Sequence, residues 1–345
     1  MSTIPQTLEA PGALIHPFAG AAAGGRVWRI GVAAAVAWAA FGLLTWRWPN
    51  HVVGFSDWTF TAELGVAALL AGAALFVLAL AGAYVAPLRP VQASLQPAGP
   101  WLIAVPVVLA AWETLTAKSG VLPTPFFAPP QALIEVYTED WARLGESVLN
   151  TLKLLGLGYS LGALTGFLVG VSIGWSRAVG YWVHPVLRIV GPLPATALLP
   201  ITFYFFPSSY SAAAFLIALA AGFPVAVLTW SGVAGVSKSY YDVARTLGAS
   251  NAFLVLRVAI PAALPQVFVG LFMGLGASFT VLVTAEMMGV KSGLGWYLTW
   301  AQGWASYVNM YAALIVMALL FSSIITLLFK ARDRALVWQK GTLKW

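Results

Sequence analysis

The sequence contains few charged residues and no cysteine. Only 8% of its 345 residues are Asp, Glu, Lys or Arg, whereas 60% are hydrophobic; an ordinary soluble domain carries roughly 25% charged residues. So few charges cannot cover a soluble surface, and lipid is therefore expected to be the solvent for most of the chain. The absence of cysteine excludes a disulfide framework, a thiolate metal site and a cysteine nucleophile.

Other chemical signatures are missing as well. The three histidines, His16, His51 and His184, are scattered, which argues against a metal site and against the catalytic constellation that a membrane-embedded enzyme needs. No G-x-x-x-x-G-K-[ST] motif occurs, so the chain is expected to bind no nucleotide itself. The net charge of +7 is better explained by membrane topology than by nucleic acid, which is not expected as a partner.

Long hydrophobic runs predict an all-α, polytopic membrane protein with about eight transmembrane helices. The predicted spans are 27–46, 58–85, 101–115, 147–175, 186–206, 215–236, 267–288 and 307–329. Residues 1–25 are rich in Ala, Gly and Pro and predict a tail, not a cleaved signal peptide. A Pro- and Gln-rich linker, 87–100, divides the chain into residues 1–99, which hold the tail and two extra helices, and residues 100–345, a core of about six helices.

The distribution of Lys and Arg predicts the orientation in the membrane. With the C-terminal tail inside, eight crossings place both termini in the cytoplasm. The inside segments then contain Arg26, Arg29, Arg89, Arg177, Arg188, Lys238, Arg245, Arg257, Lys330, Arg332, Arg334, Lys340 and Lys344. The outside segments contain Arg47, Lys118, Arg143, Lys153 and Lys291.

Two of the predicted spans have an unusual composition. In span 147–175 a glycine recurs at every fourth position, which predicts a face for close helix packing: Gly158, Gly162, Gly166, Gly170 and Gly174. Span 186–206 contains Pro192, Pro194 and Pro200, so it is not expected to form an unbroken helix. Irregular backbone at membrane depth is tolerated inside protein or beside a water-filled cavity; this span is thus either part of a translocation path, with Arg188 as an anion contact, or a kinked, buried helix.

Three carboxylates lie within or at the ends of predicted spans, where they are costly and often functional. Glu63 lies in the second span, and Glu113 lies close to the outer interface, where water is expected to reach it. Glu286 lies near the outer end of the seventh span. Its alternatives are to pair with Arg188, to line the outer gate of the path, or to be a satisfied structural acid.

The polar loop 237–262 interrupts the second half of the chain. Lys238, Asp242 and Arg245 predict one polar face of a short helix, and the opposite, mostly apolar face consists of Tyr240, Val243, Ala244 and Leu247. Gly248 is expected to turn the chain in the left-handed conformation, and Ser250 to cap a second short helix. Pro261 is expected to stop that helix.

This loop resembles the cytoplasmic EAA signature of ABC importer permeases. That signature reads E-A-A, three residues, G, nine residues, I-x-L-P; the chain has Asp242-Val243-Ala244, Gly248 and Val258-Ala259-Ile260-Pro261 at the same spacing. The stretches LRIVGPLPATALLPITFYFF and TAEMMGVKSGLGWYLTWAQGW resemble the nitrate, sulfonate, taurine and bicarbonate branch of these permeases. The resemblance covers roughly residues 100–345 and leaves the two extra helices without an assigned role.

The resemblance implies a type I ABC importer permease in a bacterial inner membrane. Its implied partners are a second permease copy, two ATP-binding cassette subunits that bind ATP and Mg, and a periplasmic solute-binding protein. The loop would be the coupling helix, with Tyr240, Asp242, Val243, Ala244, Leu247, Gly248 and Pro261 facing the ATPase. The alternative is an ion-coupled secondary transporter, which requires paired mid-membrane carboxylates and repeated halves; neither is evident.

Overall fold

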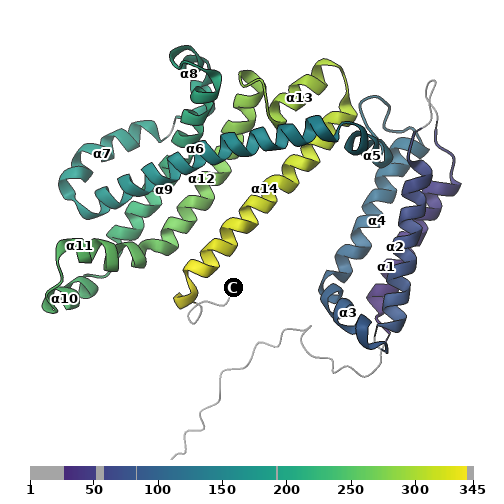
Figure 1. Cartoon of the computed structure of the whole chain (residues 1–345), viewed down its shortest axis with the longest axis horizontal. Helices are drawn as coiled ribbons and strands as arrows, with labels where there is room; N and C mark the ends of the chain where they lie inside the picture. The colour runs from purple at the N-terminus through teal and green to yellow at the C-terminus, as the bar shows by residue number, and fades with distance from the viewer. Residues whose placement is uncertain (1–26, 52–57, 83, 192, 340–345) are drawn as a thin grey trace, which may run out of the picture. The chain divides into compact units, whose positions relative to one another are not determined.

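The computed structural model describes residues 27–51, 58–82, 84–191 and 193–339. The predicted N-terminal tail and Pro192 lie outside the described residues. The chain forms two compact units, Met1–Val121 and Leu122–Trp345, and the described part of both is helical (Figure 1). The predicted all-α, polytopic class is therefore confirmed.

The first unit is a small bundle in which α1 packs against both α2 and α4. Glycines allow a close approach within it: a Cβ on Gly42 would lie 2.8 Å from the carbonyl oxygen of Gly65. The helices are α1 (Arg29–Arg47), α2 (Thr61–Ala81), α3 (Arg89–Leu95), α4 (Gly99–Glu113) and a π-helical turn (Thr114–Lys118). The unit thus includes α4, the first helix of the predicted core; which helices form that core functionally stays a prediction.

A buried ion pair closes this bundle. Glu113 Oε1 lies 3.3 Å from Lys118 Nζ, and neither side chain is exposed. Lys118 also donates to the carbonyl oxygens of Thr45 and Trp48, and Glu113 accepts from the Thr45 hydroxyl at 2.7 Å. The expectation that water reaches Glu113 is wrong, because the π turn brings residues five apart onto one face and pairs the carboxylate with an ammonium inside the bundle.

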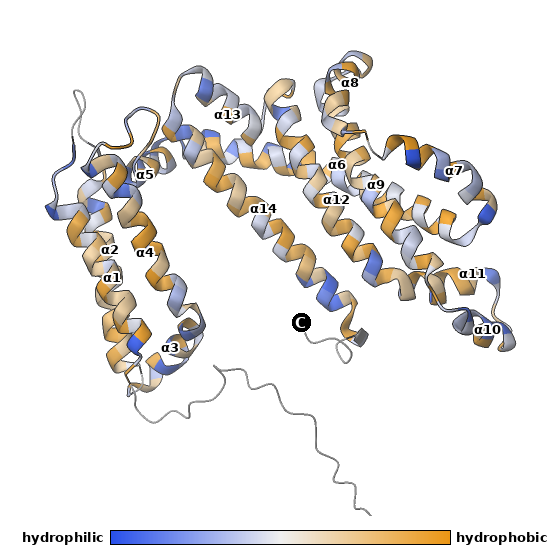
Figure 2. Cartoon of the chain, turned by 180° about the vertical axis from the view of Figure 1, so that it is seen from behind, coloured by the Kyte–Doolittle hydropathy of each residue, from blue (hydrophilic) through white to orange (hydrophobic). Residues whose placement is uncertain are grey.

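The second unit contains the longest helices. Its elements are α5 (Pro130–Glu139), α6 (Trp141–Trp175), α7 (Arg177–Val190), η4 (Ala195–Leu198), α8 (Leu199–Phe205), α9 (Ser209–Ala234), α10 (Lys238–Thr246), α11 (Asn251–Phe253), the π-helical η5 (Leu254–Ala259), α12 (Ile260–Met288), α13 (Leu294–Gly303), α14 (Tyr307–Ala335) and η6 (Val337–Gln339). Hydrophobic residues dominate α9, α12 and α14 (Figure 2).

Helices α6 and α9 run parallel, with the glycine stripe of α6 against α9. A Cβ on Gly158 would lie 2.7 Å from Ile217 Cβ, and one on Gly174 would lie 2.7 Å from Val233 Cβ. Later residues of α6 therefore contact later residues of α9, so the two helices point in the same direction. The connecting residues, 176–208, must consequently run from the end of α6 back to the end of the pair where α9 begins. We call the end where α6 and α9 terminate the loop end, and the opposite end the α13 end (Figure 1).

The returning segment is a broken helix. Helix α7 and the η4–α8 pair are bent by 83° relative to each other and together are long and apolar enough to cross a membrane. With the seven helices of the described residues that meet this test singly, the pair makes up to eight crossings, as predicted. The prediction that span 186–206 is no continuous helix is confirmed, although the break follows a helix that begins earlier, at Arg177.

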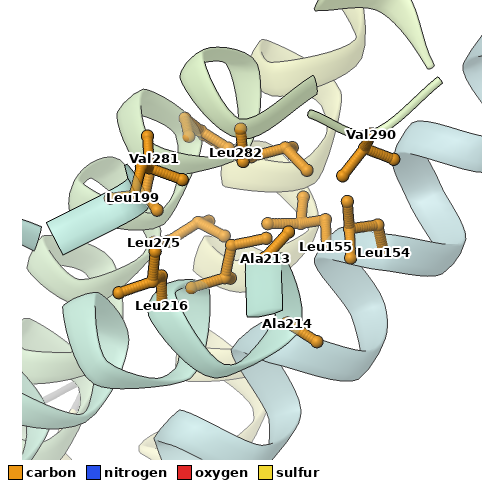
Figure 3. Close-up of a cluster of buried hydrophobic side chains, with 13 residues drawn as sticks. Leu154, Leu155, Leu199, Ala213, Ala214, Leu216, Leu275, Val281, Leu282 and Val290 are labelled. Atoms are coloured by element: carbon orange, nitrogen blue, oxygen red, sulfur yellow. The ribbon is translucent and has the colours of Figure 1, made fainter. Parts of the chain in front are cut away.

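The core of this unit lies where α6, α8, α9 and α12 meet. Leu199 of α8 is fully buried among Leu216 of α9 and Leu275 and Leu282 of α12 (Figure 3). Helix α14 joins through the stacked rings of Phe321 and Phe279, whose centroids are 3.9 Å apart. This packing holds η4, α8 and the adjoining helices together, so the broken segment is anchored at its α13 end.

Candidate functional site

The polar loop forms a compact helical hairpin at the loop end. Helix α10 has no buried residue. At its end Gly248 adopts φ +83°, its N–H donates to the Arg245 carbonyl at 2.9 Å, and the Ala249 N–H donates to the Ala244 carbonyl at 3.0 Å. These two bonds form a Schellman motif, which confirms the turn predicted at Gly248.

The second helix differs from the prediction. Ser250 caps it as expected, since its hydroxyl accepts from the Phe253 N–H at 3.3 Å. However, Pro261 does not stop the helix: α11, the π-helical η5 and α12 form one continuous segment, Asn251–Met288. Pro261 stands in the first turn of α12, directly after the π-helical turns. A proline is tolerated in a first turn, and the wider turn accommodates its missing N–H.

A tyrosine that the sequence argument did not select anchors α10. The ring of Tyr241 packs edge-on against that of Trp175, with centroids 5.8 Å apart, and it contacts the buried cluster of Val233, Ala259 and Ala263. Its partial burial raises the pKa of its phenol above the ordinary value. The amphipathic pattern placed Tyr240 and its neighbours on the apolar face of α10. It did not reveal that Tyr241 is the residue that contacts the membrane helices.

The predicted apolar face of α10 is turned outward. Tyr240, Val243 and Leu247 are 63%, 61% and 83% exposed, and Phe253 of α11 is 50% exposed. With Ala244, Gly248, Ala249 and Ser250 they line a hollow of about 750 Å³ between α10 and α11. The surrounding residues are too polar for lipid: Asp242 and Arg245 are more than half exposed and form a loose ion pair at 3.9 Å. An exposed apolar hollow with a polar rim is typical of a protein-docking site.

The candidates for the translocation path lie apart from this loop. Arg188 is exposed on α7. Pro194 precedes η4, and Pro200 stands in the first turn of α8. Within the described residues, Arg188 and Glu286 form no ion pair with each other; the carboxylate of Glu286 has other partners.

Glu286 organises the start of α13. Its two carboxylate oxygens accept from the Thr151 hydroxyl and the Gly295 N–H, each at 2.8 Å, and the Thr151 oxygen accepts from the Leu294 N–H at 2.8 Å. Glu286 is only 1% exposed. Gly293 has φ +100°, and any side chain on it would collide with the carboxylate. This geometry matches a satisfied structural acid, one of the three alternatives.

A second polar network supports α13 from the junction of α5 and α6 and from α14. The hydroxyl of Tyr297 donates to Asp140 at 2.7 Å and accepts from the Asn309 amide at 2.6 Å. Burial raises the pKa of the Tyr297 phenol, and the hydrogen bond to Asp140 raises it further. Arg143 stacks over the ring of Trp300 at 4.3 Å. The polar groups that hold α13 in place are thus paired within the chain.

With this geometry established, comparison with known proteins identifies the family. Residues 162–337 match the model of the family described as "Binding-protein-dependent transport system inner membrane component". This match covers half of the chain, so the chain belongs to this family. It is a membrane-spanning permease component of such a transport system, as the loop motif predicted.

Three of the relatives are named as permeases for small anions. The chain is 28% identical over 256 residues to the nitrate import permease NrtB of Synechococcus elongatus, covering 71% of this chain and 89% of the relative. It is 30% identical over 220 residues to the putative aliphatic sulfonates permease SsuC of Bacillus subtilis, covering 61% and 77%. It is also 30% identical over 192 residues to the bicarbonate permease CmpB of Synechococcus elongatus, covering 55% and 66%.

Among solved structures, the chain is similar to one from the inward-facing MetNI methionine ABC transporter. The TM-score is 0.47 at 20% sequence identity, and the match covers 56% of this chain and 95% of that chain.

Proposed function

We propose that the chain forms the translocation path of an ATP-driven importer for a small oxyanion or organic anion, such as nitrate, a sulfonate or bicarbonate. The names of its relatives support this substrate class. In this proposal two copies of the chain assemble in a bacterial inner membrane with both termini in the cytoplasm. A periplasmic binding protein delivers the anion at the α13 end.

The observation that carries the proposal is the exposed hollow between α10 and α11. In a polar segment, four large apolar side chains without cover favour a partner protein over lipid. We assign this partner as an ATPase subunit that binds ATP and Mg. Because Tyr241 fixes α10 to Trp175 and to the start of α12, a push on the hollow is transmitted to α6, α9 and α12.

Ion-coupled secondary transport is the rival function, and the described residues do not favour it. A proton- or sodium-coupled site needs carboxylates free to exchange their ligand. Within the described part of the second unit, Glu286 is the buried carboxylate, and both of its oxygens are engaged by Thr151 and Gly295. In the first unit Glu113 is bound to Lys118 and Thr45.

Gly248→Val tests the coupling role. A β-branched residue is strained at φ +83° whatever the free space, so the hairpin opens while the spans stay intact. We expect normal membrane insertion and thermal stability, loss of ATPase co-purification, and loss of ATP-driven uptake in proteoliposomes supplied with nitrate, ethanesulfonate or bicarbonate.

Thr246→Val is the matched control, because it places the same side chain two residues earlier, at an exposed helical position outside the hollow. It should behave as the wild type. Normal ATP-driven uptake by Gly248→Val would contradict the coupling role. Uptake by the wild-type chain alone, without ATP, would favour the secondary transporter.

A further inference from the structure

Helix α7 runs back along α6, from the loop end toward the interior of the second unit. Near its start, a Cβ on Gly180 would lie 3.7 Å from Ile173 Cγ2. Near its end, Leu187 lines a shared apolar hollow with Thr165 and Val169 of α6. Since α6 ends at Trp175 and rises 1.5 Å per residue, the second half of α7 lies roughly 10 Å inside the loop end.

Helix α7 is sharply amphipathic at this depth. At 3.6 residues per turn, one of its faces contains Arg177, Tyr181, His184 and Arg188, and the other exposed face contains Val179, Trp182, Val186 and Ile189. Tyr181 and Ile189 are 73% and 70% exposed. On the cationic face His184 packs edge-on against Trp230 of α9, whereas Arg177, Tyr181 and Arg188 are exposed. The apolar face suits lipid, whereas the cationic face does not.

The positive charge of Arg188 has no compensating carboxylate nearby in the chain. Between Glu146 and Asp242 the sequence contains no Asp or Glu at all. Within the described residues, neither Arg177 nor Arg188 forms an ion pair, and the buried carboxylate Glu286 is saturated by other donors. An arginine at this depth without an internal partner requires water or an external anion.

The geometry points to Arg188 as an anion-contacting residue of the translocation path. Its guanidinium presents a planar fork of donors that matches an oxyanion in two parallel hydrogen bonds. Arg177, about three turns closer to the loop end on the same face, then receives the anion as it leaves. This inference rests on the proposed function and adds to it the face of the chain that the oxyanion follows. A phospholipid phosphate offers the same chemistry, and the experiment separates the two sources.

The natural absence of cysteine makes the inference directly testable. Arg188→Cys and Ile189→Cys place single thiols on adjacent residues that point to different faces of α7. Both variants, assembled with their ATPase in proteoliposomes, are treated with the anionic reagent sulfonatoethyl methanethiosulfonate. Because only a hydrated thiol forms the reactive thiolate, we expect Arg188→Cys to react about tenfold faster than Ile189→Cys.

Competition identifies the occupant. The reporter for competition is His184→Cys, which lies one turn from Arg188 on the same face of α7 and keeps the arginine. Nitrate, ethanesulfonate or bicarbonate, whichever is transported, should slow labelling of His184→Cys more than chloride does, and replacing anionic by zwitterionic lipid should not change the rate. Equal slow labelling of Arg188→Cys and Ile189→Cys would overturn the inference, since it places Arg188 in lipid. A rate that follows the lipid charge and ignores the oxyanions would also overturn it and assign Arg188 to a phospholipid headgroup.

Transport supplies a second readout. Arg188→Gln should lower oxyanion uptake roughly tenfold or more, the loss expected for a charge-assisted hydrogen bond, while ATPase co-purification and thermal stability stay normal. Arg188→Lys should restore part of the uptake, because it keeps the charge and loses the fork. Unchanged uptake by Arg188→Gln would contradict the anion-contacting role of Arg188 and leave the proposed function standing. ATP-independent uptake by the wild type would contradict the proposed function.

Discussion

The two ends of α12 differ in whether the side chains around them are covered and hydrogen-bonded by the rest of the chain. At its start, the α10–α11 hairpin exposes Tyr240, Val243 and Leu247, and α10 has no buried residue. At its end, Glu286 is buried and both of its oxygens accept hydrogen bonds that hold α13. The apolar side chains at the start of α12 need a partner that the chain itself does not supply, whereas the buried carboxylate at its end is paired within the chain.

This difference separates function from stability along one helix. An exposed apolar hollow contributes little to the fold, so substitutions there should affect assembly with a partner. A buried, saturated carboxylate contributes to the fold, so its removal should affect stability first. The following predictions test this separation, from the largest expected effect on stability to the smallest.

Glu286→Ala should have the largest effect. It leaves the Thr151 hydroxyl and the Gly295 N–H buried without an acceptor and opens a cavity, at a cost of about 3 kcal/mol of unfolding free energy. Thermal unfolding of the purified protein in detergent measures this loss. Glu286→Gln, which keeps the volume and one acceptor oxygen, should lose less. A wild-type melting temperature combined with lost uptake would instead indicate a direct transport role for Glu286.

Gly162→Ala should have an intermediate effect. The added methyl would collide with the backbone carbonyl of Ala218 and lie 2.8 Å from Ala221 Cβ, which forces α6 and α9 apart at a cost of roughly 1–3 kcal/mol. Gly156→Ala is the matched control on α6, because a Cβ there meets nothing within 4 Å. The control should be neutral or slightly stabilising through helix propensity. Equal melting temperatures for both variants would contradict the close-packing role.

Leu247→Asp should have the smallest effect on stability and a large one on assembly. Leu247 is 83% exposed, so the unfolding free energy should change by less than about 0.5 kcal/mol. A charge in the hollow should abolish co-purification of the ATPase, because the partner's apolar contact is lost. Thr246→Asp adds the same charge outside the hollow and should retain the ATPase. Equal retention by both variants would exclude the hollow as the docking surface.

Local features were predictable from the sequence because their causes are local. Gly248 turns the chain since it adopts φ +83° without a Cβ penalty, and Ser250 bonds an N–H only three residues away. The prolines of span 186–206 exclude a straight helix by their own chemistry. The effect of Pro261 was not predictable, because it depends on the π-helical turns before it, which no residue pattern in the sequence indicated.

Features that depend on distant partners were not predictable. Thr45 and Glu113 are 68 residues apart, and Thr151 and Glu286 are 135 apart. No periodicity in one segment reveals such a partner, so the sequence left Glu286 with three roles and placed Glu113 in water. Tyr241 was missed for the same reason, because its inward direction is set by Trp175 on another helix.

The sequence by itself determined the membrane class, the positions of the long apolar helices and the position of the polar loop 237–262. Hydrophobic runs, prolines and motif spacing act within short segments, and the lipid environment enforces them. Only the tertiary structure decided that α6 and α9 run parallel and that the apolar side chains of α10 face outward. It also decided that Arg188 is exposed on α7 and forms no ion pair within the described residues. These properties arise from packing between distant segments, where close contact and the burial of charge select one arrangement.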